Sequence, residues 1–408
     1  MKLHRTTTII IGILLCCALP LSGCASLYAK YREVEQLRIM QALGLDRAPG
    51  GVIVTLAAAA DPSGSAPLCF SGTGESVSAA IESVRGRAAE EDLFTGHLKH
   101  ILIGEAAARQ GLEPYLSYIC RSPDVRLDMP LFILRGGTAR EAMSTAGTEE
   151  RGIAEVLQAA QTSLDTQSGG NVFTAAEILR SLWRDGSALI CALEYGPASE
   201  TSDSGAGGPS SGEAGAADTA DSEPSDAGGS GEAPVMTAAA GGFAVIKDGK
   251  LCEFIDRDAA LGAGFLTNTV GIRELVVRDR FGAPVTLEIQ QGGTRLHPLW
   301  NPDGSLRGIE IYANVSAALL EAGSGTLTAA ESTDYLTGQL EAAVSDRIGA
   351  VLWLAKTLEA DFLGLGERVE QASPLKYRRM GQSLGPLLPS LELSIAVQGE
   401  LSHSHDLD

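Results

Sequence analysis

The sequence predicts an α+β fold, in which a mixed α/β N-terminal domain precedes a C-terminal antiparallel sheet with one long packed helix. Three observations support this class. Helical and strand patterns alternate up to residue 196, a polar stretch without a core-forming pattern follows at 197–235, and hairpin signals with one long apolar stripe fill 236–400. At 408 residues the chain exceeds one usual domain, which leaves room for a small middle domain.

Local patterns place the elements of the N-terminal domain, residues 24–196. Residues 28–42 begin with helical character, residues 51–57 are rich in β-branched residues and are expected as a strand, and Ser76 can cap a helix over 77–90. Further strands are expected at 97–103, 131–134 and 189–193, and further helices at 106–119 with a break at Gly111, from Thr138, at 153–160 and at 175–183.

The segment 197–235 consists almost entirely of Ser, Gly, Ala, Thr, Pro, Asp and Glu, without Lys, Arg or aromatic residues. Such a composition buries too little apolar surface to offset the entropy of ordering, and its acidic charges repel one another. We therefore expect a disordered linker here. Residues 401–408 are expected to be a flexible tail.

The C-terminal domain, residues 236–400, changes to hairpins. Strands at 243–246 and 251–255 flank Lys-Asp-Gly-Lys at 247–250, in which Asp-Gly suits a tight turn. An apolar residue recurs at every third or fourth position over 333–359, which predicts one long amphipathic helix. Other strands are expected at 274–277, 284–290, 308–317 and 391–397.

The first residues have the pattern of a bacterial lipoprotein signal. Lys2 and Arg5 precede an apolar run that begins near Thr8 and closes on Leu-Ser-Gly-Cys at 21–24. We expect residues 1–23 to be cleaved between Gly23 and Cys24, so that Cys24 carries S-diacylglycerol and an N-acyl chain. The alternative is an ordinary secretory peptide with an incidental cysteine.

The net charge of −20 argues against nucleic acid as a partner, because phosphates require a basic surface. The four cysteines outside the signal and anchor show no CxxC or ligand-like spacing and are expected to be small buried apolar residues, although export would permit disulfides. They are Cys69, Cys120, Cys191 and Cys252.

Catalytic and metal-binding motifs do not emerge from the sequence. We find no nucleophile elbow, P-loop or His-Glu-x-x-His helix, and we expect no catalytic residue, metal or cofactor. His97 and His100 fall three apart in an expected strand, so their side chains would point to opposite faces. Gly-Leu-Gly at 364–366 is interpreted as a helix C-cap and turn rather than a phosphate loop.

Several ordered segments resemble one known family. They are the Cys24 lipobox, Gln-Ala-Leu-Gly-Leu-Asp at 41–46, the helix start at 74–81, residues 97–105 with 108–112, residues 121–126, the strand at 309–321, and 360–367 with its D-x-x-G-x-G pattern followed by Pro374. Together they resemble the Ger(x)C family of spore germination lipoproteins, although Leu27, Tyr28 and Tyr377 stand where the family often has tryptophan.

This resemblance implies a non-enzymatic C subunit of a spore germinant receptor. Such a subunit would be lipid-anchored to the outer face of the spore inner membrane, would assemble with integral-membrane A and B subunits, and would be needed for nutrient-triggered germination. The alternatives are a lipid-anchored extracytoplasmic binding protein that serves a transporter, for which a cleft between similar lobes is expected, and an extracytoplasmic hydrolase.

Nine residues within the resembling segments are candidates for partner-facing or conformational roles. Each could instead be a turn or cap glycine or part of a surface ion pair. They are His97, Gly104, Glu105, Arg121, Arg126, Asp361, Gly364, Gly366 and Pro374.

Overall fold

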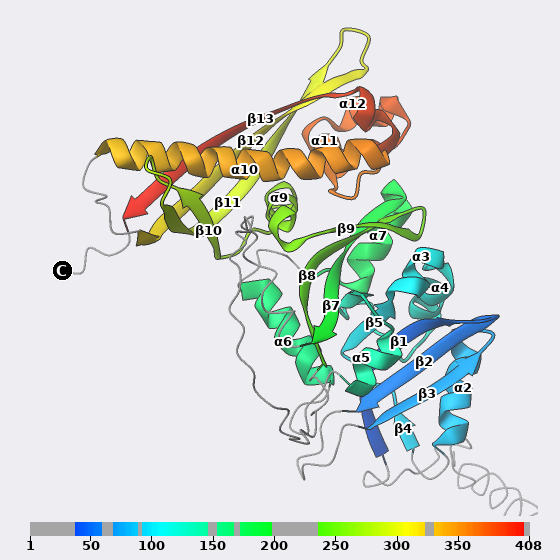
Figure 1. Cartoon of the computed structure of the whole chain (residues 1–408). Helices are drawn as coiled ribbons and strands as arrows, with labels where there is room; N and C mark the ends of the chain where they lie inside the picture. The colour runs from blue at the N-terminus through cyan, green and yellow to red at the C-terminus, as the bar shows by residue number, and fades with distance from the viewer. Residues whose placement is uncertain are drawn as a thin grey trace, which may run out of the picture.

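The computed structural model describes residues 37–58, 68–88, 92–145, 153–166, 172–197, 236–322 and 330–403. These residues form two sheets joined by a shared core, with helices on both faces of the first sheet and one long helix across the second (Figure 1). The α+β class is confirmed. The lipoprotein signal with Cys24, the linker at 198–235 and the last five residues of the expected tail lie outside the described residues.

The first sheet combines a parallel centre with antiparallel margins. Its order is β3-β2-β1-β5-β6-β7-β8-β9, with β4 paired to β1. Strands β1, β5, β6 and β7 run parallel to one another. The strands are β1 (Leu37–Ala48), β2 (Gly51–Ala58), β3 (Cys69–Gly74), β4 (Asp92–Phe94), β5 (His100–Gly104), β6 (Leu131–Arg135), β7 (Ser187–Pro197), β8 (Met236–Lys247) and β9 (Lys250–Ile255).

Helices cover the two faces of this sheet and use alternate strand residues. Ile101 and Ile103 of β5 share a core with α2, α3, α4 and α7, whereas Leu102 packs in the core with α5 and α6. The alternation follows from the two-residue period of a strand. The helices are α2 (Val77–Arg87), α3 (Glu105–Gln110), α4 (Glu113–Arg121), α5 (Ala139–Thr145), α6 (Ile153–Thr166) and α7 (Ala175–Asp185).

The second sheet has the order β10-β11-β12-β13. The long helix α10 (Ala330–Leu358) buries its expected apolar stripe against the sheet from Leu336 to Ala355. The remaining elements are α9 (Arg257–Thr267), β10 (Arg273–Arg278), β11 (Pro284–Trp300), β12 (Leu306–Ala322), α11 (Leu365–Ala372), α12 (Pro374–Met380), the 3₁₀ helix η2 (Gly385–Ser390) and β13 (Glu392–His403).

Most element types were predicted, with shifted ends. The 77–90 helix ends at Arg87, with Ser76 accepting a hydrogen bond from the Ala79 amide as its N-cap, and the strand expected at 97–103 starts only at His100. The helical interpretation of 28–42 is wrong for residues 37–42, because these lie in β1. Strand β3 and helix α9 were not predicted.

Two features of the second half differ from the expected arrangement. The hairpin of β8 and β9 extends the first sheet through β7, so the change of sheet falls after Ile255 rather than at 197–235. Strand β13 pairs with β12 in parallel, so the second sheet is not wholly antiparallel. The helices α10, α11 and α12 and the 3₁₀ helix η2 separate the two strands in sequence, and this long connection permits parallel pairing.

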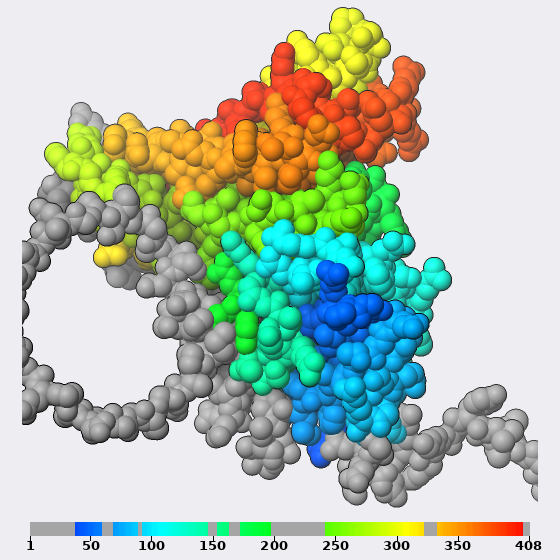
Figure 2. All heavy atoms as spheres, turned by 45° about the vertical axis from the view of Figure 1, so that its right-hand side comes forward, coloured from blue at the N-terminus to red at the C-terminus, as the bar shows by residue number. Residues whose placement is uncertain are grey.

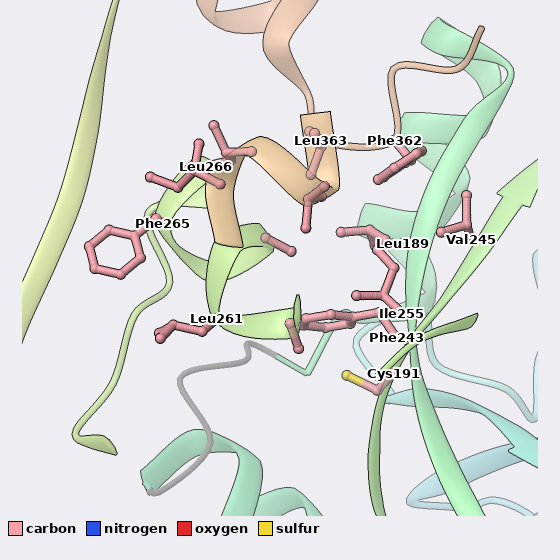
Figure 3. Packing of buried hydrophobic residues seen from close by; sticks show 14 of the residues in the cluster. Leu189, Cys191, Phe243, Val245, Ile255, Leu261, Phe265, Leu266, Phe362 and Leu363 are labelled. Atoms are coloured by element: carbon pink, nitrogen blue, oxygen red, sulfur yellow. The ribbon is translucent and has the colours of Figure 1, made fainter. Parts of the chain in front are cut away.

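One hydrophobic core continues from the first sheet into the second. Figure 3 shows Leu189, Phe243 and Ile255 of the first sheet facing Leu261 of α9 and Phe362, which follows α10. Figure 2 shows the resulting stack, in which the orange and red C-terminal segments lie over green strands and these lie over the cyan and blue N-terminal half. The two sheets therefore form one packed body.

The cysteines are more exposed than expected. Cys191 is buried, Cys69 and Cys252 are partly buried, and Cys120 is exposed, so the expectation of burial is wrong for Cys120. The Cys69 thiol donates a hydrogen bond to the Met143 carbonyl at 2.9 Å, and burial raises its pKa to about 11. Such a thiol remains protonated and unreactive at neutral pH.

Candidate functional site

Helix α5 begins on a buried carboxylate at the end of β1. Asp46 is 2% exposed and accepts the amides of Ala139 and Arg140 at 2.8 and 2.7 Å. Burial raises the pKa of Asp46 above its ordinary value, while these two amides pull it down. The carboxylate thus binds the unpaired N–H groups at the start of α5, where the helix dipole also favours a negative charge.

Two glycines make room for this arrangement. A Cβ on Gly104 would lie 2.1 Å from Asp46 Oδ1, and a Cβ on Gly44 would lie 2.3 Å from Met143 Sδ. Beside them, Glu105 accepts the Gly136 amide at 3.1 Å and the Arg109 guanidinium at 2.8 Å. Burial opposes ionisation of Glu105, but these hydrogen bonds outweigh it and hold its pKa below the ordinary value.

A second buried aspartate caps a helix in the C-terminal half. Asp361 is 1% exposed and accepts the amides of Leu365 and Gly366 at 2.8 and 2.6 Å. Burial raises its pKa to about 6 against the opposing pull of the Gly366 amide. The helix α11 therefore starts on Asp361, in the same manner as α5 starts on Asp46.

The glycines of the D-x-x-G-x-G segment are explained by this cap. Gly364 has a φ of 69°, a conformation that glycine adopts without strain, and it is the N-cap of α11. The C-cap interpretation of 364–366 is therefore wrong. A Cβ on Gly366 would lie 2.7 Å from the Tyr377 hydroxyl and 2.9 Å from Asp361 Oδ2, so the cap leaves no space for a side chain.

An ion cluster ties this region to the first sheet. Arg184, near the end of α7, contacts Glu367 of α11 and also binds Asp185 Oδ2 at 2.7 Å. The Asp185 side chain is 1% exposed, and burial raises its pKa despite the neighbouring guanidinium. In addition, Lys247 Nζ at the end of β8 donates to the Leu358 carbonyl of α10 at 2.7 Å. We call Arg184, Asp185, Lys247, Asp361 and Glu367 the interdomain joint.

The interdomain joint gives a direct stability prediction. Arg184→Met should lower the free energy of unfolding by about 3 kcal/mol, because it leaves the buried Asp185 carboxylate without its cation. Chemical denaturation measures this change. Arg126→Met is the matched control, since its partner Asp128 is exposed and the pair lies in solvent, and it should leave stability unchanged. Equal losses in the two variants would contradict a structural role for the joint.

The nine candidate residues fall into two groups. Gly104, Glu105, Asp361, Gly364 and Gly366 belong to the two aspartate-capped regions, where they shape the fold. The other four are exposed. They are His97 in the turn before β5, Arg121 at the end of α4, Arg126, and Pro374 at the start of α12. The Thr95 hydroxyl, two residues before His97, donates to Asp124 at 2.8 Å, so the segments that hold His97, Arg121 and Arg126 are neighbours, whereas Pro374 lies in α12 of the other half.

Sequence reasoning missed five of the site residues, namely Asp46, Arg184, Asp185, Lys247 and Glu367. Asp46 could have been noticed as an acidic residue that ends an apolar strand within a family-like segment. Among the described residues, no group of three His, Cys, Asp or Glu side chains could hold a metal ion. His97 and His100 do not converge, since His97 is exposed while His100 is buried, with its pKa lowered by burial to about 4.

Comparisons with known proteins agree with this geometry. Residues 30–195 match the family model described as spore germination protein N-terminal domain, and residues 241–405 match the model described as spore germination B3/GerAC-like, C-terminal. No curated protein sequence matches the chain. The crystal structure of the GerBC protein is similar in fold, with a TM-score of 0.51 at 15% identity, over 88% of this chain and 96% of that one. The chain belongs to the Ger(x)C family of spore germination proteins.

Proposed function

We propose that this chain is the lipid-anchored, non-enzymatic C subunit of a spore germinant receptor, and that it supports nutrient-triggered germination by assembling with integral-membrane A and B subunits. The observation that carries the proposal is that both halves match spore germination domains in the right order. The similarity of fold to GerBC supports it further.

Anchoring through Cys24 is the second part of the proposal. None of the described helices combines the length and apolar character needed to cross a bilayer. The Leu-Ser-Gly-Cys sequence at 21–24 supports a lipid on Cys24, placed on the outer face of the spore inner membrane. A tether confines the subunit to the plane of its partners and raises their effective concentration, so that weak contacts can hold an assembly.

The four exposed candidates are our proposed partner-facing residues. His97, Arg121, Arg126 and Pro374 lie in family-like segments and reach solvent. By contrast, the buried aspartate caps support a rigid frame that presents such surfaces. We propose no catalytic role for the two regions capped by Asp46 and Asp361.

Replacing the anchor cysteine tests the proposal. In spores lacking the wild-type gene, Cys24→Ala should abolish palmitate labelling, move the protein out of the membrane fraction and reduce germination with the nutrients that depend on this receptor. Cys120→Ala removes an exposed thiol elsewhere and should leave labelling, fractionation and germination unchanged. A Cys24→Ala protein that stays labelled and membrane-bound would refute the anchor.

Deletion of the gene tests the receptor role separately. Germination should be lost for at least one nutrient, and an affinity-tagged chain should co-purify with multi-spanning A and B subunits from detergent-solubilised spore membranes. Co-purification with a transporter instead, together with unchanged germination in strains that lack the other receptors, would refute the receptor role.

A further inference from the structure

A groove lies between α12 and the turn that joins β11 to β12. It has a volume of about 780 Å³ and is lined on one side by Trp300, Asn301 and Ser305, and on the other by Lys376 and Arg379. In Figure 1 the β11–β12 turn extends past α12, and in Figure 2 its yellow tip stands beside the orange-red segment. This volume is in the range of small-molecule sites.

The cations of this groove have no acidic partner in the part of the chain that the structure describes. Residues 374–382 carry Lys376, Arg378 and Arg379 and no acidic residue, although the whole chain has 51 acidic and 31 basic residues. The Lys376 ammonium lies 5.5 Å from the centre of the Trp300 ring, a cation–π contact rather than an ion pair. Among the described residues, neither Lys376 nor Arg379 forms an ion pair, although both line the groove.

Trp300, which lines the groove, also carries a donor without an acceptor. The Trp300 indole Nε1 is shielded from solvent and has no hydrogen-bond partner among the described residues. A buried donor without an acceptor is unfavourable, so an acceptor that reached this nitrogen would stabilise the complex.

The acidic member of the lining is already engaged. Asp303 Oδ1 accepts the Ser305 amide at 2.8 Å and the Ser305 hydroxyl at 2.6 Å, and Asn301 Nδ2 donates to Ser305 Oγ at 2.9 Å. These bonds fix the turn and hold the pKa of Asp303 below its ordinary value. Asp303 thus stabilises the wall of the groove and keeps one negative charge there, against the two positive charges of Lys376 and Arg379.

We propose that this groove binds a small organic anion with a carboxylate or phosphate group, and that Lys376 and Arg379 are its ion partners. A small molecule fits better than a flat anionic surface, because the two cations border a cavity. Strand β1 begins beside β4, at the end of the molecule away from α12 (Figure 1), so the groove also lies far from the point where the N-terminal segment enters the fold.

The intrinsic fluorescence of Trp300 tests this site. The chain has three tryptophans, and Trp183 and Trp353 are 78% and 67% exposed, so Trp183→Phe and Trp353→Phe leave Trp300 as the one reporter with little cost in stability. The full chain, purified in a non-ionic detergent, is titrated with glutarate and with inorganic phosphate at constant ionic strength. A saturable change in fluorescence with either probe is expected.

Matched charge removals identify the cations. Lys376→Gln and Arg379→Gln should each weaken binding by about tenfold, as expected for the loss of a charged hydrogen bond. Arg378→Gln removes the same charge from the same helix but does not line the groove, and it should change binding by less than about twofold. Unchanged near-ultraviolet circular dichroism in all three variants excludes misfolding as the cause.

The site would be refuted if neither glutarate nor phosphate gave a saturable change in fluorescence. It would also be refuted if Arg378→Gln weakened binding as much as Lys376→Gln and Arg379→Gln do. A fluorescence response to phosphatidylglycerol vesicles, but to neither soluble anion, would indicate a lipid surface instead. The measurement requires neither receptor subunits nor spores. Its result is therefore independent of the proposed receptor role.

Discussion

Gly262→Ala should lower the free energy of unfolding by about 3 kcal/mol, because α9 and α10 touch backbone to backbone at this glycine. A Cβ on Gly262 would lie 2.1 Å from the Arg347 carbonyl oxygen and 2.9 Å from the Ile348 amide nitrogen. Neither backbone atom can move without displacing α10. Overpacking of this kind typically costs about 1–3 kcal/mol, and the upper end applies where the obstacle is backbone.

The displaced helix α9 carries the contact between the two sheets. Its Leu261 and Phe265 are fully buried in the core that includes Phe243 of the first sheet and Leu287 of the second. On the α10 side, Asp258 accepts the Arg347 guanidinium at 2.7 Å. Separation of α9 from α10 would therefore loosen both halves of the protein, and the melting temperature should fall by roughly 5–10 °C.

Gly338→Ala is the matched control for this substitution. Gly338 also lies within a helix, but it is on the exposed side of α10 and a Cβ there meets nothing within 4 Å. Alanine should stabilise this helix by about 0.5–1 kcal/mol. Thermal unfolding followed by circular dichroism compares the two variants. If Gly262→Ala melts at the wild-type temperature, the close packing of α9 on α10 is not present in solution.

Helix α9 also shows why part of the fold escaped prediction. It is apolar or small on nearly all sides, with residues 260–266 all buried, because it lies between the first sheet and α10. A helix without a polar face lacks the amphipathic period by which helices are recognised. The apolar stripe of α10, by contrast, could be predicted from the sequence, because the other side of that helix faces solvent.

Strand β1 was missed for a related reason. It pairs with β2 and β5, and residues 42–46 are all buried, so the strand is covered on both faces and shows no alternation of polar and apolar residues. The hairpin at 247–250 was predicted correctly, because Asp-Gly at a tight turn is a local signal. The attachment of that hairpin to β7 depends on pairing across the linker, which no local pattern encodes.

The site residues also divide into those with partners nearby in the sequence and those with distant partners. The D-x-x-G-x-G segment was identified from its resemblance to a family pattern, but the role of Asp361 as the cap of α11 was not predicted, although Asp361 lies only four and five residues from the amides it binds. Asp46, however, binds amides 93 and 94 residues later, and Arg184 meets Glu367 across both halves of the chain. Partners so distant in sequence become visible only once the strands and helices are placed.

Asp361→Asn should make the stability of the protein less dependent on pH between about 4 and 6. Burial raises the folded-state pKa of Asp361 from 3.8 to about 6, so the folded protein holds this proton more tightly than the unfolded chain does. The resulting contribution to stability is fully present below pH 3.8 and is lost as the pH rises through about 6. The loss is on the order of 3 kcal/mol.

The asparagine side chain does not titrate in this range. Its NH₂ group is a donor, so it cannot accept a hydrogen bond from the backbone amide of Leu365 or Gly366. The variant should therefore have a lower free energy of unfolding than the wild type at pH 4. This difference in free energy should become smaller as the pH approaches 7. Chemical denaturation at each pH measures the difference. Asp303→Asn supplies the control, because hydrogen bonds from Ser305 lower the pKa of that exposed carboxylate below 3.8, so its stabilisation is lost only at lower pH and the difference from the wild type should not narrow between pH 4 and 7. A constant difference for Asp361→Asn would mean that the carboxylate stays ionised throughout this range, so that the two amide hydrogen bonds outweigh the cost of burial at the start of α11.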